Sequence, residues 1–312
     1  MTMQEKLEAY LKTVPYAIKP ERLYTTADLF DVFDPEDPSS FERCYDTRIY
    51  QHELKTGKLT ESRYEMAARS LHDFGIRQAL KAFLSQYEQT KVVGIMGGHG
   101  LARTTNAYRQ AAEVSKRLTE AGYLMISGGG PGAMEATHLG AWMAGRSEAE
   151  LDEALQILAE APTFQDQGWL ACAFRVIARF PLQSEYKSLS IPTWYYGHEP
   201  PCAFATHAAK LFENSIREDT LLTEAYGGLI FMEGSAGTLQ EIFQEAVQNH
   251  YVCLGYSSPM IFVGSRFWNE EVPVVPFINH MLNNGRYKNL IIDVADTTEQ
   301  IVEAIRRFKP KL

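Results

Sequence analysis

Cysteine is scarce in this 312-residue sequence, and its four cysteines lie far apart with no C-x-x-C pair among them. Closely spaced cysteines are the usual signature of a disulfide framework or of a zinc site. Neither is predicted here, and scattered thiols suit a reducing cytoplasm. The four residues are Cys44, Cys172, Cys202 and Cys253.

The sequence also lacks a long hydrophobic run. A membrane-spanning helix needs about 20 predominantly apolar residues in succession, and no stretch approaches that length. The first residues, MTMQEKLEAYLKTV, lack the apolar core and the small-residue cleavage site of a signal peptide. We therefore expect a soluble, cytoplasmic protein with no membrane partner.

Positive charge is also in deficit. The chain has 30 Lys and Arg against 39 Asp and Glu, which gives a formal net charge of −9. General nucleic-acid binding requires a basic surface, so no nucleic-acid partner is expected. A small phosphorylated ligand is not excluded, because a local pocket of oriented dipoles can oppose the overall field.

Several catalytic and metal-binding motifs are missing. There is no G-x-S-x-G, H-E-x-x-H or Walker A sequence. His99, His138 and His198 are isolated and lack metal-ligand spacing, so we interpret them as capping, loop or core residues. No metal and no cofactor are predicted.

The sequence does contain three short apolar runs that each end in a glycine-rich turn. The turns are residues 97–100, 128–132 and 234–237, and a helical pattern follows each of them. Strands followed by glycine turns and helices are typical of βαβ units, which predicts an α/β fold with a parallel sheet. The turns would then lie at the carboxyl edge of the sheet, where such sheets bind ligands. The first two do not match the dinucleotide fingerprint in register, which favours a mononucleotide over NAD or FAD.

The hydrophobic pattern divides the chain into a helical N-terminal extension, residues 1–90, and a nucleotide-binding domain, residues 91–312, with an insertion near 145–188. Residues 41–51 are interpreted as a half-buried connector, with a functional lip as the alternative, and residues 161–188 are expected to be irregular. Helical patterns begin at residue 238 and cover residues 4–12, 61–87, 106–121, 133–144, 148–160, 202–224 and 297–308. Apolar runs predict strands at residues 91–96, 123–127, 190–194, 228–232, 259–263 and 290–294.

The most informative stretch is residues 226–251, which reads as a buried strand, a tight turn and a helix. Free backbone N–H groups and the positive end of the helix dipole converge at such a turn, so a phosphate is the expected ligand. Thr238 and Glu241 have the spacing of a capping box, in which each side chain bonds the other's amide. The alternative is that Thr238 binds the phosphate while Glu241 faces the pocket as an acid, a base or a ribose ligand.

A cationic stripe beside this site favours the ligand-binding alternative. On a helix over residues 202–224, His207, Lys210, Asn214 and Arg217 share one face. Aligned cations next to an anion site suit a phosphate or a developing negative charge, although a solvated charged face is the plainer alternative. The acidic residues of the segment lie off that face: Glu213, Glu218 and Asp219.

Two motifs resemble the paired motifs of the LOG (Lonely Guy) family. GGGPGAME at residues 128–135 is similar to the GGGxxGxM loop of that family, and GSAGTLQE at residues 234–241 is similar to its PGGxGTxxE loop. The resemblance covers roughly residues 90–308. It implies a Rossmann-like parallel sheet flanked by helices, a homodimer, and hydrolysis of the N-glycosidic bond of nucleoside 5′-monophosphates to a free base and ribose 5-phosphate.

The resemblance also implies roles for residues. Glu241 falls on the family's catalytic glutamate, and Arg217 is the nearest match to its catalytic arginine, one position out of register. Glu233 replaces the motif's proline and Ser235 its second glycine, and a carboxylate at the loop entrance would repel phosphate unless it points away. The residues expected to bind the substrate or its phosphate are Gly98, Gly129, Gly130, Glu135, Gly234, Ser235, Ala236, Gly237, Thr238 and Asn214.

Three functions are alternatives at this point. A nucleotide phosphoribohydrolase is the first. A non-catalytic nucleotide-binding sensor or carrier on the same fold is the second, because Glu233 and Ser235 depart from the motif. An interaction protein whose contact surface is residues 1–90 is the third. Release of free base from nucleoside monophosphates separates the first from the second.

Overall fold

The computed structural model describes residues 2–310 and contains a seven-stranded parallel sheet in the order β4-β3-β2-β1-β5-β6-β7. The predicted α/β fold with a parallel sheet is therefore confirmed. Met1, Lys311 and Leu312, which the predicted ranges include, lie outside the described residues. The strands are β1 Val92–Met96, β2 Leu124–Ser127, β3 Ser188–Ser190, β4 His207–Ala208, β5 Gly228–Phe231, β6 Pro259–Val263 and β7 Ile291–Ala295.

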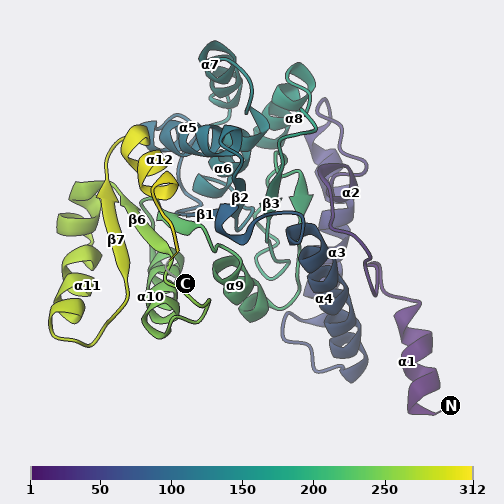
Figure 1. Cartoon of the computed structure of the whole chain (residues 1–312). Helices are drawn as coiled ribbons and strands as arrows, with labels where there is room; N and C mark the ends of the chain where they lie inside the picture. The colour runs from purple at the N-terminus through teal and green to yellow at the C-terminus, as the bar shows by residue number, and fades with distance from the viewer. Residues whose placement is uncertain (1, 311–312) are drawn as a thin grey trace.

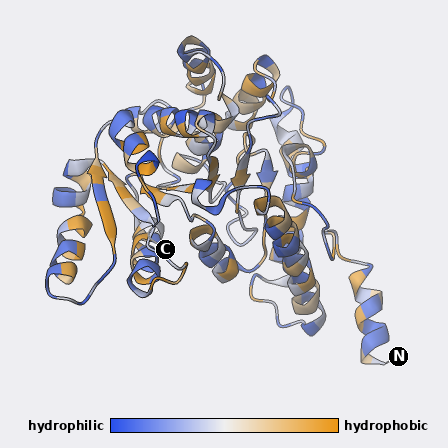
Figure 2. Ribbon diagram, viewed as in Figure 1, coloured by the Kyte–Doolittle hydropathy of each residue, from blue (hydrophilic) through white to orange (hydrophobic). Residues whose placement is uncertain are grey.

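Helices cover both faces of the sheet (Figure 1). In that view α5 (Asn106–Glu120), α6 (Ala133–Trp142) and α12 (Thr298–Arg306) lie above it, and α9 (Asn214–Thr223) and α10 (Ala236–Tyr251) lie below it. Every residue of the central strands β1, β2, β5 and β6 is buried, because a parallel sheet packs helices on both sides. Figure 2 shows the same division: the strands are mostly hydrophobic, and the helices have a hydrophobic side and a hydrophilic side.

The N-terminal helices pack at the β4 end of the sheet. Backbone hydrogen bonds between Tyr24 and Ala208 add an antiparallel bridge to this last strand, so its open edge is partly covered. The predicted helices near residues 4–12 and 61–87 are confirmed as α1 and α4. The helices and helical turns of this region are α1 Met3–Leu11, α2 Thr26–Leu29, η1 Pro38–Arg43, α3 Tyr45–Thr56, α4 Arg63–Leu84 and η2 Gln89–Lys91.

Two segments are more regular than the sequence pattern indicated. Residues 41–51, expected to be a connector, form the end of η1 and the first half of α3. Residues 161–188, expected to be irregular, contain α8 (Trp169–Arg179), whose buried face carries Trp169, Cys172 and Val176. The remaining helices are α7 Glu148–Leu158, η3 Phe267–Glu271 and α11 Val274–Asn283. Among residues 2–310, none of the helices combines the length and the apolar character that a membrane crossing requires.

The predicted helix over residues 202–224 is wrong in its first half. Residues 202–213 are not helical: they contain a turn at residues 203–204 and the strand β4, and the helix α9 begins only at Asn214. Nearly all side chains from Cys202 to Phe212 are buried, which is the pattern of a covered strand rather than of a one-sided helix. The pairing with β3 and Tyr24 therefore overrides the helical spacing.

The third strand also differs from the prediction, because β3 ends at Ser190 where the predicted strand begins. The chain stays close to the sheet as far as Thr193, which forms a parallel bridge with Leu211. Pro192 lies within this stretch and has no N–H to donate to a ladder, so regular pairing stops before it.

Candidate functional site

The carboxyl ends of β1, β2 and β5 are neighbours in the sheet, and the loops that follow them surround a cavity of about 560 Å³. The three glycine turns therefore meet at one edge. The predicted residues that line the cavity are Gly98, Gly129, Gly130, Arg217, Ser235, Ala236, Gly237, Thr238 and Glu241. Gly234, Asn214 and Glu135 do not line it.

The first turn of α10 forms one wall of the cavity and is not capped by a side chain. Ser235 is the N-cap residue and the helix begins at Ala236, so Thr238 is the third helical residue. The capping box between Thr238 and Glu241 is therefore not formed, and that alternative is wrong. Uncapped amides at a helix N-terminus are donors available to an anionic ligand.

Gly234 shapes this turn without lining the cavity. A Cβ atom at this position would lie 2.1 Å from Oγ1 and 2.6 Å from Cβ of Thr238. Thr238 is buried against the turn, so only glycine allows this close approach.

Glu233, the departure at the loop entrance, does not face the cavity. Its backbone oxygen accepts a hydrogen bond of 3.1 Å from the amide of Gly98. Its carboxylate lies beside the turn after β6, where Oε1 is 3.3 Å from the position that a Cβ on Gly264 would take. The Glu233 carboxylate therefore points away from the cavity, which is the arrangement in which it does not repel a phosphate at the loop entrance.

Glu241 lies one turn into α10 and faces the cavity. The pKa of its carboxyl group is raised to about 7, chiefly by burial and to a smaller extent by the negative charge of the nearby Glu218. The guanidinium of Arg217 opposes this shift by favouring the ionised form. A carboxyl group that titrates near neutral pH in a cavity is typical of an acid–base catalyst.

Arg217 lies on α9 and lines the cavity from a second side. Its Nη2 donates a hydrogen bond of 3.0 Å to Oδ1 of Asn214, and its guanidinium lies 5.9 Å from the centre of the Tyr196 ring. Among the described residues, its Nε is a buried donor without an acceptor, and no carboxylate forms an ion pair with it. Asn214 thus orients Arg217, and the guanidinium is free to bind an anionic ligand.

The predicted cationic stripe does not exist as one helix face. His207 belongs to β4, and Lys210 lies in the extended segment before α9. Lys210 lines the cavity, but its Nζ is 2.5 Å from Oδ1 of Asp46, so its charge is neutralised. The predicted segregation of charge is also wrong, because Glu218 lines the cavity beside Arg217.

Glu135 forms a buried ion pair instead of facing the larger cavity. Its Oε1 is 2.5 Å from Nη2 of Arg103 and its Oε2 is 2.9 Å from Nε, and the Tyr108 hydroxyl donates to Oε2 at 2.8 Å. Arg103 also donates to the backbone oxygens of Ala161 and Trp169. The pair therefore fastens α6 to the segment between α7 and α8, beside a smaller cavity of about 180 Å³.

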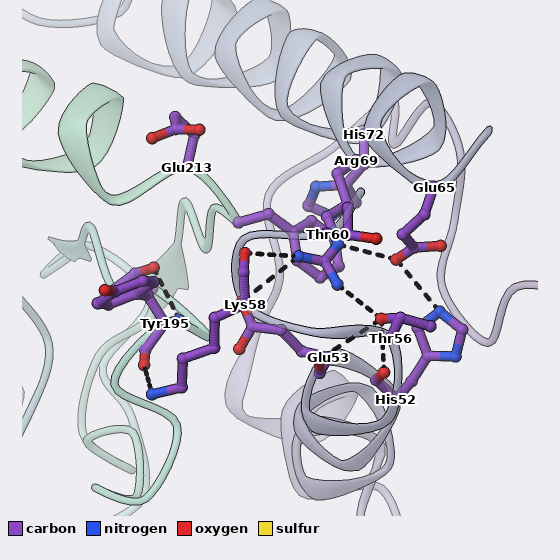
Figure 3. A network of polar contacts seen from close by, with 12 residues as sticks. His52, Glu53, Thr56, Lys58, Thr60, Glu65, Arg69, His72, Tyr195 and Glu213 are labelled. Carbon is purple, nitrogen blue, oxygen red and sulfur yellow. Dashed lines mark hydrogen bonds and ion pairs between the residues drawn. The ribbon is translucent and has the colours of Figure 1, made fainter. Parts of the chain in front are cut away.

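The N-terminal helices reach the site through a polar network that the sequence pattern did not reveal (Figure 3). Arg69 of α4 donates to Glu65 at 2.8 Å, to Thr56 at 2.7 Å and to the backbone oxygen of Lys58 at 3.1 Å. Lys58 in turn donates to the backbone oxygen of Tyr195 at 2.5 Å. Tyr195 begins the loop that supplies Tyr196 and Glu199 to the cavity. Lys58, which follows α3, therefore holds this loop in place.

A second contact from α4 fixes the start of α9. The carboxylate of Asp73 accepts hydrogen bonds from the amides of Phe212 and Glu213, at 3.0 and 2.9 Å. These amides precede the helix that carries Arg217.

Three residues that line the cavity were not predicted from the sequence: Tyr196, Glu199 and Glu218. The loop at 195–201 had one available signal, because it follows a predicted strand of a parallel sheet and so had to reach the carboxyl edge.

Glu245 lies one turn beyond Glu241 on α10 and has a structural role. It is buried, and its Oε1 accepts hydrogen bonds from the Ser258 hydroxyl at 2.6 Å and from the Asn249 amide at 3.1 Å. Burial raises its pKa to about 7, as burial also does for Glu53. Because the native state holds the proton more tightly than the unfolded chain does, stability from this group is present below pH 4.5 and is lost as the pH rises through 7.

Glu245→Gln is therefore expected to gain stability relative to the wild type by about 2–3 kcal/mol on going from pH 4.5 to pH 8. Urea unfolding at both pH values measures this difference, with the exposed substitution Glu303→Gln as the control. An equal stability difference between variant and wild type at the two pH values would contradict the assignment.

The described residues 2–310 contain no cluster of three or more His, Cys, Asp or Glu side chains that is arranged to hold a metal ion. His138 lies in the core, where its ring nitrogens bond the hydroxyls of Ser127 at 2.8 Å and Ser188 at 2.9 Å.

Comparison with protein-family models and with curated protein sequences finds no match. Solved structures with a similar chain arrangement include the structural-genomics target TM1055, at 18% identity and a TM-score of 0.45 over 70% of this chain and 99% of that chain. The molybdenum cofactor binding protein from the phototrophic bacterium Rippkaea orientalis matches at 16% identity and a TM-score of 0.42, over 69% and 94% of the two chains. The Moco carrier protein of Chlamydomonas rheinhardtii matches at 16% and 0.40, over 69% and 95%. At these levels the similarity concerns the fold alone, a Rossmann-like α/β sheet.

Proposed function

We propose that the protein hydrolyses the N-glycosidic bond of a nucleoside 5′-monophosphate and releases a free base and ribose 5-phosphate. The observation that carries this proposal is the cavity shared by three groups: the uncapped start of α10, the guanidinium of Arg217 and the carboxyl group of Glu241. Such a reaction uses a binding site for the 5′-phosphate, a cation that binds anionic oxygens of the substrate, and a carboxyl group that titrates near neutral pH. The resemblance of residues 128–135 and 234–241 to the LOG motifs supports the same proposal.

The 5′-phosphate would bind the start of α10. Ser235, Ala236 and Gly237 line the cavity there, and their amides lie at the positive end of the helix dipole. The carboxylate of Glu233 points away from this position, so its charge does not oppose the phosphate at short range. This placement makes the phosphate a handle that holds the ribose one helical turn away, near Glu241.

Cleavage passes through a state in which the ribose ring carries positive charge, and a nearby carboxylate stabilises that charge. Glu241 in its ionised form would do this and would accept the proton of the attacking water. Arg217 would bind the anionic oxygens of the substrate, because the described residues leave it without an ion pair. Asn214 keeps the guanidinium in position.

The alternative of a non-catalytic nucleotide carrier explains the phosphate site equally well. A carrier would use Glu241 only to bind the ribose hydroxyls, whereas a hydrolase also uses the capacity of this carboxyl group to exchange a proton near neutral pH. The raised pKa of this group therefore favours the hydrolase. Following the resemblance, we also propose a homodimer, which light scattering of the purified protein would test.

The deciding experiment is an assay of base release from a panel of purine and pyrimidine nucleoside 5′-monophosphates. We expect release from at least one of them and none from the matching nucleoside, because the nucleoside lacks the phosphate handle. Tight binding of a monophosphate without release of base across the panel would establish the carrier instead.

A further inference from the structure

Two histidines and a glutamate meet at the cavity and are not used by the proposed mechanism. Nδ1 of His99 lies 3.4 Å from Oε1 of Glu199, and Nε2 of His198 lies 3.8 Å from the same oxygen. All three residues line the cavity. The histidine side chains are 56% and 59% exposed, whereas that of Glu199 is 17% exposed. The sequence indicated isolated loop histidines, and the tertiary structure brings them to one carboxylate.

The backbone holds His99 in a fixed place relative to α10. A Cβ atom on Gly132 would lie 2.8 Å from the carbonyl carbon of His99, so the two loops are in direct contact. The backbone oxygen of Gly98 accepts a hydrogen bond of 3.3 Å from Ala133, and the amide of Gly98 donates to Glu233. His99 is thus anchored to the loop after β2 and to the loop that leads into α10 and Glu241.

The proposed reaction needs a proton donor that has not yet been assigned. When the bond between ribose C1′ and the base nitrogen breaks, its electron pair moves to the base, and protonation of the base stabilises this charge. Arg217 cannot supply that proton, because a guanidinium stays protonated in proteins. Glu241 is engaged at the ribose. Histidine is the side chain best suited to transfer a proton near neutral pH.

We propose that His99, oriented by Glu199, is the general acid that protonates the leaving base. This inference rests on the proposed hydrolase function and adds a third catalytic residue to it. Glu199 is a positioning residue, because its carboxylate faces Nδ1 of His99 and leaves Nε2 as the nitrogen available to a ligand. We select His99 over His198 because it is closer to Glu199 and lies in the anchored loop.

The imidazolium of His99 gives its proton to a ring nitrogen of the base while the C1′–N bond breaks and its electron pair stays on the base. Water attacks C1′ and gives a proton to Glu241. The products are the neutral base and ribose 5-phosphate. Glu241 then releases its proton to solvent, and the exposed imidazole of His99 takes one up from solvent.

The test compares two substrates that differ in their need for this proton. One is the purine monophosphate on which the wild type is most active, and the other is its 7-methyl derivative, whose base already carries a positive charge. We expect His99→Gln to lower kcat by about 10²-fold on the first substrate and by only a few-fold on the second. Glu199→Gln should lower kcat on each substrate, and by a smaller factor than His99→Gln does. His280→Gln on α11, an exposed histidine away from the cavity, is the matched control and should change neither rate.

The outcomes separate this inference from the function on which it rests. Wild-type protein that releases base neither from any monophosphate of the panel nor from the 7-methyl derivative overturns the hydrolase itself. An active wild type in which His99→Gln slows both substrates equally overturns the role of His99 and leaves the hydrolase intact. If His198→Gln lowers kcat much more on the unmethylated substrate than on the 7-methyl derivative, and His99→Gln does not, then His198 is the general acid and the choice of His99 is overturned.

Discussion

Glu241→Gln is expected to lower kcat for base release by at least about 10²-fold, with little change in the affinity for nucleotide. Glutamine keeps the size of the side chain and removes both the negative charge and the capacity to accept a proton. The phosphate would still bind the start of α10, because Ser235, Ala236 and Gly237 are untouched. Steady-state kinetics and calorimetric titration with a monophosphate measure the two quantities separately.

Glu245→Gln provides a matched control for this experiment. Both glutamates lie on α10, one turn apart, and burial raises the pKa of both. Only Glu241 lines the cavity, so only its substitution should reduce turnover. Full activity in Glu241→Gln would remove this residue from the mechanism, and an equal loss in both variants would point to damage to the helix.

Glu135→Ala is expected to lower the free energy of unfolding by about 3–5 kcal/mol, because it leaves a buried guanidinium without its counter-charge. Arg103 and Glu135 are both almost completely buried, and the hydroxyl of Tyr108 depends on the same carboxylate. Arg103 also holds the backbone at Ala161 and Trp169, so the insertion should loosen with it. Denaturant unfolding followed by circular dichroism measures the loss.

The control for this substitution is Glu299→Ala, which removes an exposed ion pair with Arg117 and should change stability by less than about 1 kcal/mol. If Glu135→Ala is too unstable to purify, Glu135→Gln keeps the volume and should show a smaller loss. A stable variant with a weakened affinity for nucleotide would instead assign Glu135 to ligand binding, as the motif resemblance implied.

Much of the site was readable from the sequence because its parts are local. A buried strand, a glycine turn and a helix start occur within a few residues of one another, and each has its own pattern. The rule that ligands bind at the carboxyl edge of a parallel sheet then brings residues 97–100, 128–132 and 234–237 together without any coordinates. Glu241 follows from the same local pattern, since it lies one turn into the helix.

Long-range contacts decided the rest. Residues 202–213 have helical spacing, yet they pair with β3 and Tyr24, and pairing between distant segments leaves little trace in a local pattern. The direction of the Glu233 carboxylate depends on the turn after β6, which lies about 30 residues further along the chain. Glu135 has the position of a ligand-binding residue in the motif, but Arg103 neutralises it.

The sequence by itself therefore determined the parallel α/β fold and the strand, glycine turn and helix start that carry Glu241, because hydrophobic period and turn chemistry act over a few residues. Only the tertiary structure decided which charges remain free in the cavity. Lys210 is paired with Asp46, whereas Arg217 has no ion pair among the described residues, and Glu199 is shared by His99 and His198. Pairing between charges depends on distances across the fold, and those distances are set by packing between segments that are remote in the chain.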